Sequence, residues 1–333
     1  MAPHVVGNLV VLALAIGTAA AVLAGRRSEI WREAGRELRR RRPIALAAIG
    51  IYVAIALADA VAWRTPAEPY PRSLVDRCFP ADFQERSYSA PLAANHFYGD
   101  IPLRWPGRHL LGTDILGRDV LHMTLKGARV ALLIGGLTSL IVIPLALLFG
   151  TAAGYVGGRL DDVVFFLMST LASMPGLLLL IALIMVLGHG TVQVCVALGV
   201  TGWVGFCRVA RGETLKLREL DYVAAARALG ASGPRIVVTH VVPNLMHLVI
   251  ITFVLMFSGL VLSEAILSWL GIGLAGSWGQ MIDQARDELA RDPPIVWNLL
   301  AASVALFGLI LAVNVVGDAL RDVLDPRTLR ERR

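Results

Sequence analysis

Apolar residues along the chain gather in long runs, and charged residues are confined to the blocks between those runs. A run of about 20 apolar residues has the length of a helix that crosses the hydrocarbon core of a bilayer. Lipid offers the backbone no hydrogen-bond partner, so each spanning run must be helical. The predicted spans are 5–24, 44–63, 130–154, 162–187, 190–209, 245–270 and 296–316. The pattern therefore predicts an all-α integral membrane protein with about seven transmembrane helices.

Composition supports this class. Of 333 residues, 56% are hydrophobic and 17% are charged, against about 25% charged in soluble domains. The net charge of +6 sits at the ends of the apolar runs rather than on a face with aromatic residues, so the lipid bilayer is an expected partner and nucleic acid is not. The three cysteines lack CxxC spacing and the seven histidines form no HExxH motif. We expect no metal site and no catalytic residues.

Two interpretations of the first run stay open. Val22-Leu23-Ala24 resembles a signal-peptide cleavage site. However, no Lys or Arg precedes the run, whereas Arg26 and Arg27 follow it, which favours a retained helix with its N-terminus outside.

Arginine distribution predicts the orientation of the spans. The segment between the first two runs, GRRSEIWREAGRELRRRRP, is placed in the cytoplasm by the positive-inside rule and also suits a helix lying on the anionic inner leaflet. Alternation then puts residues 64–129 outside, and both 211–240 and the tail from Asp318 inside. We therefore expect a cytoplasmic C-terminus.

Two polar stretches interrupt the spans. Residues 64–108 are rich in Pro, Arg, Asp and Tyr and have little periodicity, which predicts an external loop or small cap. Residues 211–243 read as a helical hairpin, too long for a tight turn. Within it, DYVAAARAL favours a helix, Gly230 is a C-cap, and Ser232 with Pro234 favours a restart.

This hairpin resembles the cytoplasmic loop shared by permease subunits of ATP-binding-cassette importers. The family pattern is EAA, three residues, Gly, nine residues, then Ile-x-Leu-Pro. Ala224-Ala225-Ala226 occupies the EAA positions, Gly230 the glycine, and His240-Val241-Val242-Pro243 the closing element. Ala224 stands where Glu is usual, which puts a charge contact there in question; Asp221 lies about one helical turn away. Docking by shape is unaffected.

Four further segments narrow the resemblance to the dipeptide/oligopeptide/nickel group, and within it to the C-type permease partner. They are HLLGTDILGRDVLHMTLKGARVALLIGG (109–136), LSEAILSWLGIG (262–273), SWGQM (277–281) and GDALRDVLDPR (317–327). The resemblance implies a six-helix core plus one extra N-terminal helix. The predicted division is 1–42 (extra helix and Arg-rich segment), 43–63 (first core span), 64–129 (external segment), 130–325 (permease core) and 326–333 (cytoplasmic tail).

The resemblance also implies a heteromeric complex in the bacterial cytoplasmic (inner) membrane. Its other members are a homologous second permease, two cytoplasmic ATPase subunits and an external solute-binding protein. The chain has no GxxxxGK[ST] motif, so ATP and Mg are expected on the ATPase subunits, with no cofactor in this chain and no enzymatic activity of its own. The coupling residues carried over are Asp221, Ala224, Ala225, Ala226, Gly230, His240 and Pro243.

Residues at the start of the 109–136 segment form a second candidate site. Thr113 or Asp114 is expected to cap a short helix, glycines permit tight bends, and the family places this helix beside the external mouth. The candidates are Gly112, Thr113, Asp114, Gly117, Arg118 and Asp119. Three roles stay open: contact with the solute-binding protein, lining of the external vestibule, and a structural wedge that holds two spans apart.

Glu264 is an ionisable residue within a predicted span. It is a candidate for the translocation path or a hydrogen-bonded structural carboxylate near Ser263, Ser268 or a residue of the partner permease. The rival classes are a secondary transporter, a membrane enzyme and a self-contained membrane protein without an ATPase partner. Substrate remains open among dipeptides, oligopeptides, nickel chelates and other small solutes, with peptide the default.

Overall fold

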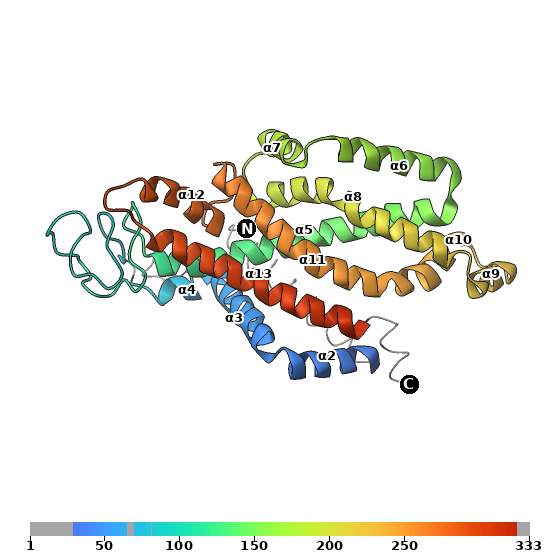
Figure 1. Cartoon of the computed structure of the whole chain (residues 1–333), viewed down its shortest axis with the longest axis horizontal. Helices are drawn as coiled ribbons and strands as arrows, with labels where there is room; N and C mark the ends of the chain where they lie inside the picture. Colours follow the sequence, from blue (N-terminus) through green and yellow to red (C-terminus); the bar gives the residue numbers. More distant parts are fainter. Residues whose placement is uncertain (1–28, 65–69, 81, 325–333) are drawn as a thin grey trace. The chain divides into compact units, whose positions relative to one another are not determined.

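The computed structural model describes residues 29–64, 70–80 and 82–324, and almost all of its regular structure is helical (Figure 1). The first helices along the described chain are α2 (Glu29–Arg41), α3 (Pro43–Ala60), α4 (Leu74–Arg77), α5 (Val120–Val156), α6 (Gly158–Ser173) and α7 (Gly176–Leu187). Those that follow are α8 (Thr191–Leu217), α9 (Asp221–Ala228), α10 (Gly233–Ile236), the π-helix Val237–Val241, α11 (Val242–Trp269), α12 (Trp278–Leu289) and α13 (Trp297–Leu324). Strands β1 (Ala62–Trp63) and β2 (Arg72–Ser73) pair antiparallel. The chain divides into two compact units, one of Met1–Leu132 with Val261–Arg333 and one of Leu133–Leu260.

Among the described residues, five helices are long and apolar enough to span a membrane, or six if one bent pair counts as a span. The five are Pro43–Ala60, Val120–Val156, Thr191–Leu217, Gly233–Trp269 and Trp297–Asp322. The all-α membrane class predicted from the apolar runs is thereby confirmed. The predicted first span, 5–24, lies outside the described residues.

The predicted span 162–187 is not one straight helix. It consists of α6 and α7, which meet at an angle of 94°. Pro175 stands at the break, where it cannot donate a backbone hydrogen bond and disfavours helical dihedrals at Met174, whose ψ is 139°. Because the apolar run is continuous across Pro175, the hydropathy pattern gave no sign of this bend.

Helix α5 corrects a second expectation. Residues 109–119 form turns and isolated bridges instead of a short capped helix, and helix begins only at Val120. Neither Thr113 nor Asp114 caps it: the Asp119 carboxylate accepts a hydrogen bond from the His122 backbone N–H (2.8 Å) in the first turn. With 37 residues, about 55 Å at the usual rise, α5 is longer than the hydrocarbon core, so its polar first turns extend beyond it.

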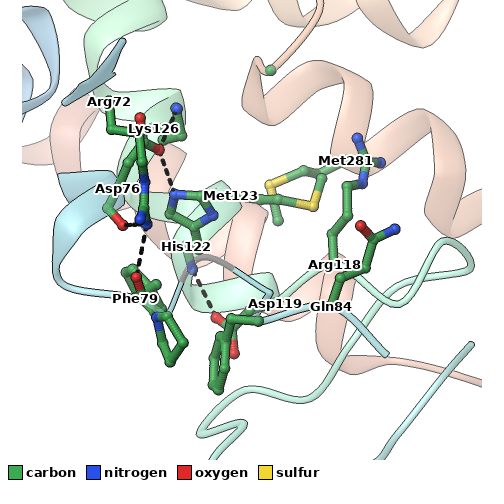
Figure 2. A pocket seen from close by; sticks show the side chains of 13 residues that line it. Arg72, Asp76, Phe79, Gln84, Arg118, Asp119, His122, Met123, Lys126 and Met281 are labelled. Atoms are coloured by element: carbon green, nitrogen blue, oxygen red, sulfur yellow. Dashed lines mark hydrogen bonds and ion pairs between the residues drawn. The ribbon is translucent and has the colours of Figure 1, made fainter. Parts of the chain in front are cut away.

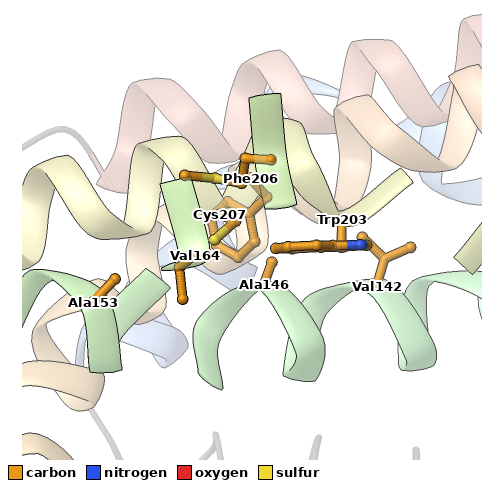
Figure 3. Close-up of a cluster of buried hydrophobic side chains, with 8 residues drawn as sticks. Val142, Ala146, Ala153, Val164, Trp203, Phe206 and Cys207 are labelled. Atoms are coloured by element: carbon orange, nitrogen blue, oxygen red, sulfur yellow. The ribbon is translucent and has the colours of Figure 1, made fainter. Parts of the chain in front are cut away.

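In the unit Leu133–Leu260, the apolar core lies between α5, α6 and α8 (Figure 3). The rings of Phe149 and Trp203 are 5.1 Å apart within it. Gly150 and Gly154 let α5 approach α8 closely. A Cβ on Gly150 would lie 2.8 Å from the Cys207 carbonyl oxygen, and one on Gly154 would lie 2.8 Å from the Arg211 carbonyl oxygen.

In the other unit, α13 packs against α3 and α12. The Tyr52 hydroxyl donates to the Ala305 carbonyl oxygen (2.9 Å), which fixes α3 on α13. The predicted loop or cap at 64–108 contains α4 and strand β2, which pairs with β1 just before the segment, and isolated bridges, including one from Ser89 to Thr113. This segment therefore has tertiary structure with little regular secondary structure.

Candidate functional site

The helical hairpin at residues 211–243, called here the 211–243 hairpin, has the local geometry that its sequence predicts. Helix α9 ends at a Schellman motif: the Ala231 N–H donates to the Ala226 carbonyl oxygen and the Gly230 N–H to that of Arg227. Gly230 has φ +83°, a conformation that costs glycine little and other residues more. Ser232 precedes α10 as the N-cap residue, without a capping hydrogen bond from its side chain.

The hairpin is anchored to its own unit by apolar side chains and one arginine. Val223, Ile236 and Val241 are fully buried. The Arg218 guanidinium donates to the Gly154 carbonyl oxygen at the end of α5 (3.0 Å). Figure 1 shows α9 projecting past the neighbouring ends of α8 and α10. The hairpin is therefore a protruding element with a fixed base.

A π-helix connects the hairpin to the next span. Pro243 lacks an N–H and follows the π-helical turn Val237–Val241, which accommodates the local change in hydrogen bonding. The Tyr222 ring lies 6.0 Å from the His240 ring, and the Asn244 amide donates to both the Tyr222 hydroxyl (3.2 Å) and the His240 carbonyl oxygen (2.6 Å). These contacts join α9 to the start of α11.

The exposed residues of α9 and of the turn after it include small and apolar side chains beside charged ones. Asp221, Ala224 and Ala225 are exposed, and Ala226 is half-buried. Leu229 exposes 88% of its surface, more than any other large apolar residue of the described chain. Of the remaining predicted coupling residues, Gly230 and Pro243 are exposed and His240 is half-buried. Sequence reasoning missed Leu229, although an apolar residue directly before a C-cap glycine was a visible signal.

The second candidate site, residues 109–119 (the 109–119 loop), is largely internal. Thr113 and Asp114 are fully buried. The Thr113 hydroxyl donates to the Ser87 carbonyl oxygen (2.8 Å), and the Trp297 indole N–H donates to the Thr113 carbonyl oxygen (3.0 Å). The Asp114 carboxylate accepts the N–H groups of Leu116 (3.0 Å) and Arg118 (2.8 Å), together with the Arg118 guanidinium.

Both predicted glycine bends of the loop are present. Gly112 has φ +75° and Gly117 has φ +71°. A Cβ on Gly112 would contact the Ser89 carbonyl oxygen and the Trp297 indole, and one on Gly117 would overlap the backbone of Glu85. Unlike Gly230, these two glycines are required by close packing as well as by backbone conformation.

A buried histidine, which the sequence did not single out, fastens the loop. The His109 Nδ1 atom is 2.8 Å from the Asp119 carboxylate, and its Nε2 atom is 3.5 Å from Glu85. Burial opposes ionisation of Glu85, but N–H groups of Arg104 and Trp105 and the nearby His109 outweigh it and hold the pKa of Glu85 below its usual value. The three side chains form a closed polar cluster.

A second polar cluster joins α4 to α5 and borders a cavity of about 380 Å³ (Figure 2). Asp76 accepts from Lys126 (2.6 Å), lies 2.9 Å from His122 Nε2, and caps α4 through the Ser73 N–H. Burial disfavours the charged carboxylate, yet these partners prevail and hold the pKa of Asp76 well below its usual range. The Asp59 carboxylate accepts a hydrogen bond from the Ser73 hydroxyl (2.8 Å) and so belongs to the same cluster. Arg118 also borders the cavity and is the most exposed ionic member of the 109–119 loop.

Glu264 lies in α11 and is 4% exposed. Its carboxylate accepts the Ser268 hydroxyl (2.6 Å), and the Ser268 oxygen is in turn 3.0 Å from the Ser277 hydroxyl and accepts the Leu274 N–H (3.2 Å). Ser268, one of the neighbours named in the structural alternative for Glu264, is thus the residue that hydrogen-bonds the carboxylate.

Among the residues that the structure describes, no group of three or more His, Cys, Asp or Glu side chains is arranged to hold a metal ion. The three cysteines are free; Cys195 and Cys207 are buried, and Cys78 is exposed. The candidate sites therefore consist of an exposed surface on the 211–243 hairpin and of buried hydrogen bonds that hold the 109–119 loop.

The long apolar helices, with the 211–243 hairpin between two of them, define a multi-pass membrane protein. The chain belongs to the family of binding-protein-dependent transport system inner membrane components, whose family model matches residues 146–330. It is the transmembrane permease subunit of an ATP-binding-cassette importer, a class of transport subunits rather than enzymes.

Named relatives agree with this family. The chain is 35% identical over 222 residues to the oligopeptide transport system permease protein OppC of Bacillus subtilis, covering 66% of this chain and 72% of the relative. It is 38% identical over 229 residues to the dipeptide transport system permease protein DppC of the same organism, covering 67% and 70%. It is 34% identical to the glutathione transport system permease protein GsiD of Pectobacterium atrosepticum, covering 66% and 73%.

Proposed function

We propose that the 211–243 hairpin is the docking element through which a separate ATPase drives this permease, and that the transported substrates are peptides. Together with a second, homologous permease the chain forms a translocation path in the bacterial cytoplasmic membrane, with an external solute-binding protein and two ATPase subunits that bind ATP and Mg. The C-terminus and the hairpin face the cytoplasm, as the arginine distribution predicts. Similarity to relatives named for oligopeptide and dipeptide transport supports the substrate class.

The observation that carries this proposal is the exposed leucine on a fixed base. Leu229, the residue directly after α9, is 88% exposed, while Val223 in the first turn of the same helix is fully buried. An exposed large apolar residue beside small Ala224 and Ala225 gives a protruding knob that a groove of another protein can cover. Arg218, which ends α8 three residues before α9, donates to the Gly154 carbonyl oxygen and so links the base of the hairpin to α5.

The absence of Glu at position 224 fits the same proposal. Asp221 is exposed in the first turn of α9, where a carboxylate also interacts favourably with the helix dipole. Docking therefore depends on shape and apolar contact, with Asp221 as the remaining acidic group on this face.

The 109–119 loop is proposed to position rather than to bind. Thr113, Asp114 and Asp119 are buried and satisfied within their own unit, which supports the structural-wedge alternative. Arg118, at the rim of the cavity beside Asp76, is the member that remains available to the solute-binding protein. Glu264 is likewise proposed as a structural carboxylate held by Ser268.

The test is co-purification of the full complex from detergent. Leu229→Asp is expected to abolish recovery of the ATPase subunits because it places a charge at the centre of the docking contact. Leu110→Asp is the matched control: this leucine is also exposed (55%), but it lies in the 109–119 loop, and ATPase recovery is expected to be unchanged. Equal recovery with both variants would refute docking through α9.

A further inference from the structure

A groove of about 300 Å³ runs between α3 and α13, within one unit of the chain. Its walls are apolar: Ala45, Ala48, Gly308, Leu311, Ala312 and Val315 line them. Small residues at four of these six positions create the space. Both helices are membrane-span candidates, so the groove opens along the acyl region of the bilayer.

Arginines stand at one end of this groove. Arg41 and Arg42, at the junction of α2 with α3, line it together with the apolar residues. Arg41 pairs with Glu37 on α2 (2.6 Å), whereas the Arg42 guanidinium has no hydrogen-bond or ion-pair partner among the described residues. Both guanidinium groups belong to exposed residues.

The charges around this end leave it positive. Helix α2 also carries Arg36, Arg39 and Arg40 among its described side chains. The groups that α13 contributes near its C-terminal end are Asp318, Arg321 and Asp322. Helix α2 packs on α13, so these carboxylates offset part of the charge, but arginines remain in excess.

We propose that this groove is a binding site for one anionic phospholipid, with an acyl chain between α3 and α13 and the phosphate against Arg42 and Arg41. The combination of an apolar channel and a cationic mouth selects the occupant. A free phosphate ion would make no favourable contact with the apolar walls. A zwitterionic lipid would be attracted less strongly, because the cation of its headgroup is repelled by the arginines. Basic pockets between transmembrane helices are suited to anionic headgroups. The site is distinct from a general attraction of α2 to an anionic leaflet, because it requires the groove.

The experiment is a lipid titration of the full-length chain in detergent, followed by native mass spectrometry, with phosphatidylglycerol, phosphatidylcholine and inorganic phosphate as probes. Retention of one phosphatidylglycerol is expected, with phosphatidylcholine weaker and phosphate not retained. Arg41→Gln/Arg42→Gln is expected to weaken retention roughly thirtyfold, from the attraction of two arginines near an anionic surface. Ala45→Phe, which fills the groove and keeps both arginines, is also expected to abolish retention.

The matched control is Arg36→Gln/Arg39→Gln, which removes the same charge from α2 at positions that do not line the groove. This double variant is expected to retain the lipid. Equal loss in both double variants, or full retention by Ala45→Phe, would show a general electrostatic attraction and overturn the site. Retention only after removal of residues 1–28 would also overturn it, by showing that the chain's own N-terminal segment fills the groove.

Discussion

The 211–243 hairpin and the 109–119 loop are both polar segments beside apolar helices, but they differ in which side chains they bury and which they expose. The loop buries Thr113 and Asp114 and satisfies each of them with groups of its own unit. The hairpin is anchored mainly by the buried apolar residues Val223, Ile236 and Val241, and it leaves Leu229 uncovered. A segment with its polar groups internally satisfied stabilises the protein that contains it. A segment with an exposed apolar residue on a fixed base is completed by another protein.

The sharpest way to break this comparison is to remove one carboxylate from each region. Asp114→Ala is expected to lower the free energy of unfolding by about 3 kcal/mol, because it leaves buried N–H groups without an acceptor and removes the partner of Arg118. Asp221→Ala is expected to change it by less than about 0.5 kcal/mol, since this residue is exposed. Thermal unfolding in detergent measures both. Similar losses would contradict the assignment of stability to the loop alone.

Two glycines with similar dihedrals sharpen the comparison further. Gly117→Ala is expected to cost about 2 kcal/mol or more, because its Cβ would meet the Glu85 backbone in addition to the strain at φ +71°. Gly230→Ala, at φ +83° with open space around it, is expected to cost about 1 kcal/mol. Unfolding midpoints of the two variants give the difference. An equal cost would mean that backbone strain alone governs both positions.

A pH profile tests the polar groups that support the loop's unit. Glu288 in α12 is buried next to Asn298. Burial, together with the negative charge of Asp114, raises the pKa of Glu288 to about 7, although the Asn298 hydrogen bond and Arg291 act in the opposite direction. Since the folded protein then holds this proton more tightly than the unfolded chain, stability is expected to fall as pH rises from about 4.5 to 7, by up to about 1.4 kcal/mol per pH unit.

Glu288→Gln cannot ionise and keeps an oxygen for the Asn298 amide. Its stability is expected to be flat over the same interval, when thermal unfolding is measured at several pH values. An unchanged pH slope in this variant would assign the dependence to another group.

The smallest expected effect comes from restoring the family's acidic residue in the hairpin. Position 224 is exposed and near the N-terminus of α9, where a carboxylate interacts favourably with the helix dipole. Ala224→Glu is therefore expected to raise the free energy of unfolding by no more than a few tenths of a kcal/mol. Recovery of the ATPase subunits is expected to stay the same or improve. A clear loss of recovery would show that the docking groove is shaped for alanine at this position.

Much of the fold could be predicted because its determinants are local. The apolar runs predict the spans, and Gly230 followed by Ser232 and Pro234 predicts the hairpin. The bend at Pro175 also had a local signal, which the uninterrupted hydropathy of 162–187 concealed. The expected short helix at 109–119 was wrong because Asp114 folds the loop upon itself instead of capping a helix.

The polar clusters could not be predicted, because their members are far apart in the chain. Asp76 meets His122 and Lys126 across 46 and 50 residues, and His109 meets Glu85 without any repeat or motif spacing. The exposure of Leu229 is equally a tertiary property: the sequence shows an apolar residue, and only packing decides whether it is covered.

The close approach of α5 to α8 has a consequence for how sequences of this family can diverge. A side chain at 150 or 154 would meet the main-chain oxygens of Cys207 and Arg211, which no exchange of a neighbouring side chain can move away. Compensating pairs of changes are therefore not open to these two positions. Gly136 and Gly212, which have free space around the missing Cβ, should by contrast drift to other small residues. Aligned descendants of a common ancestor would then show invariant glycine at 150 and 154 beside variable glycine at 136 and 212.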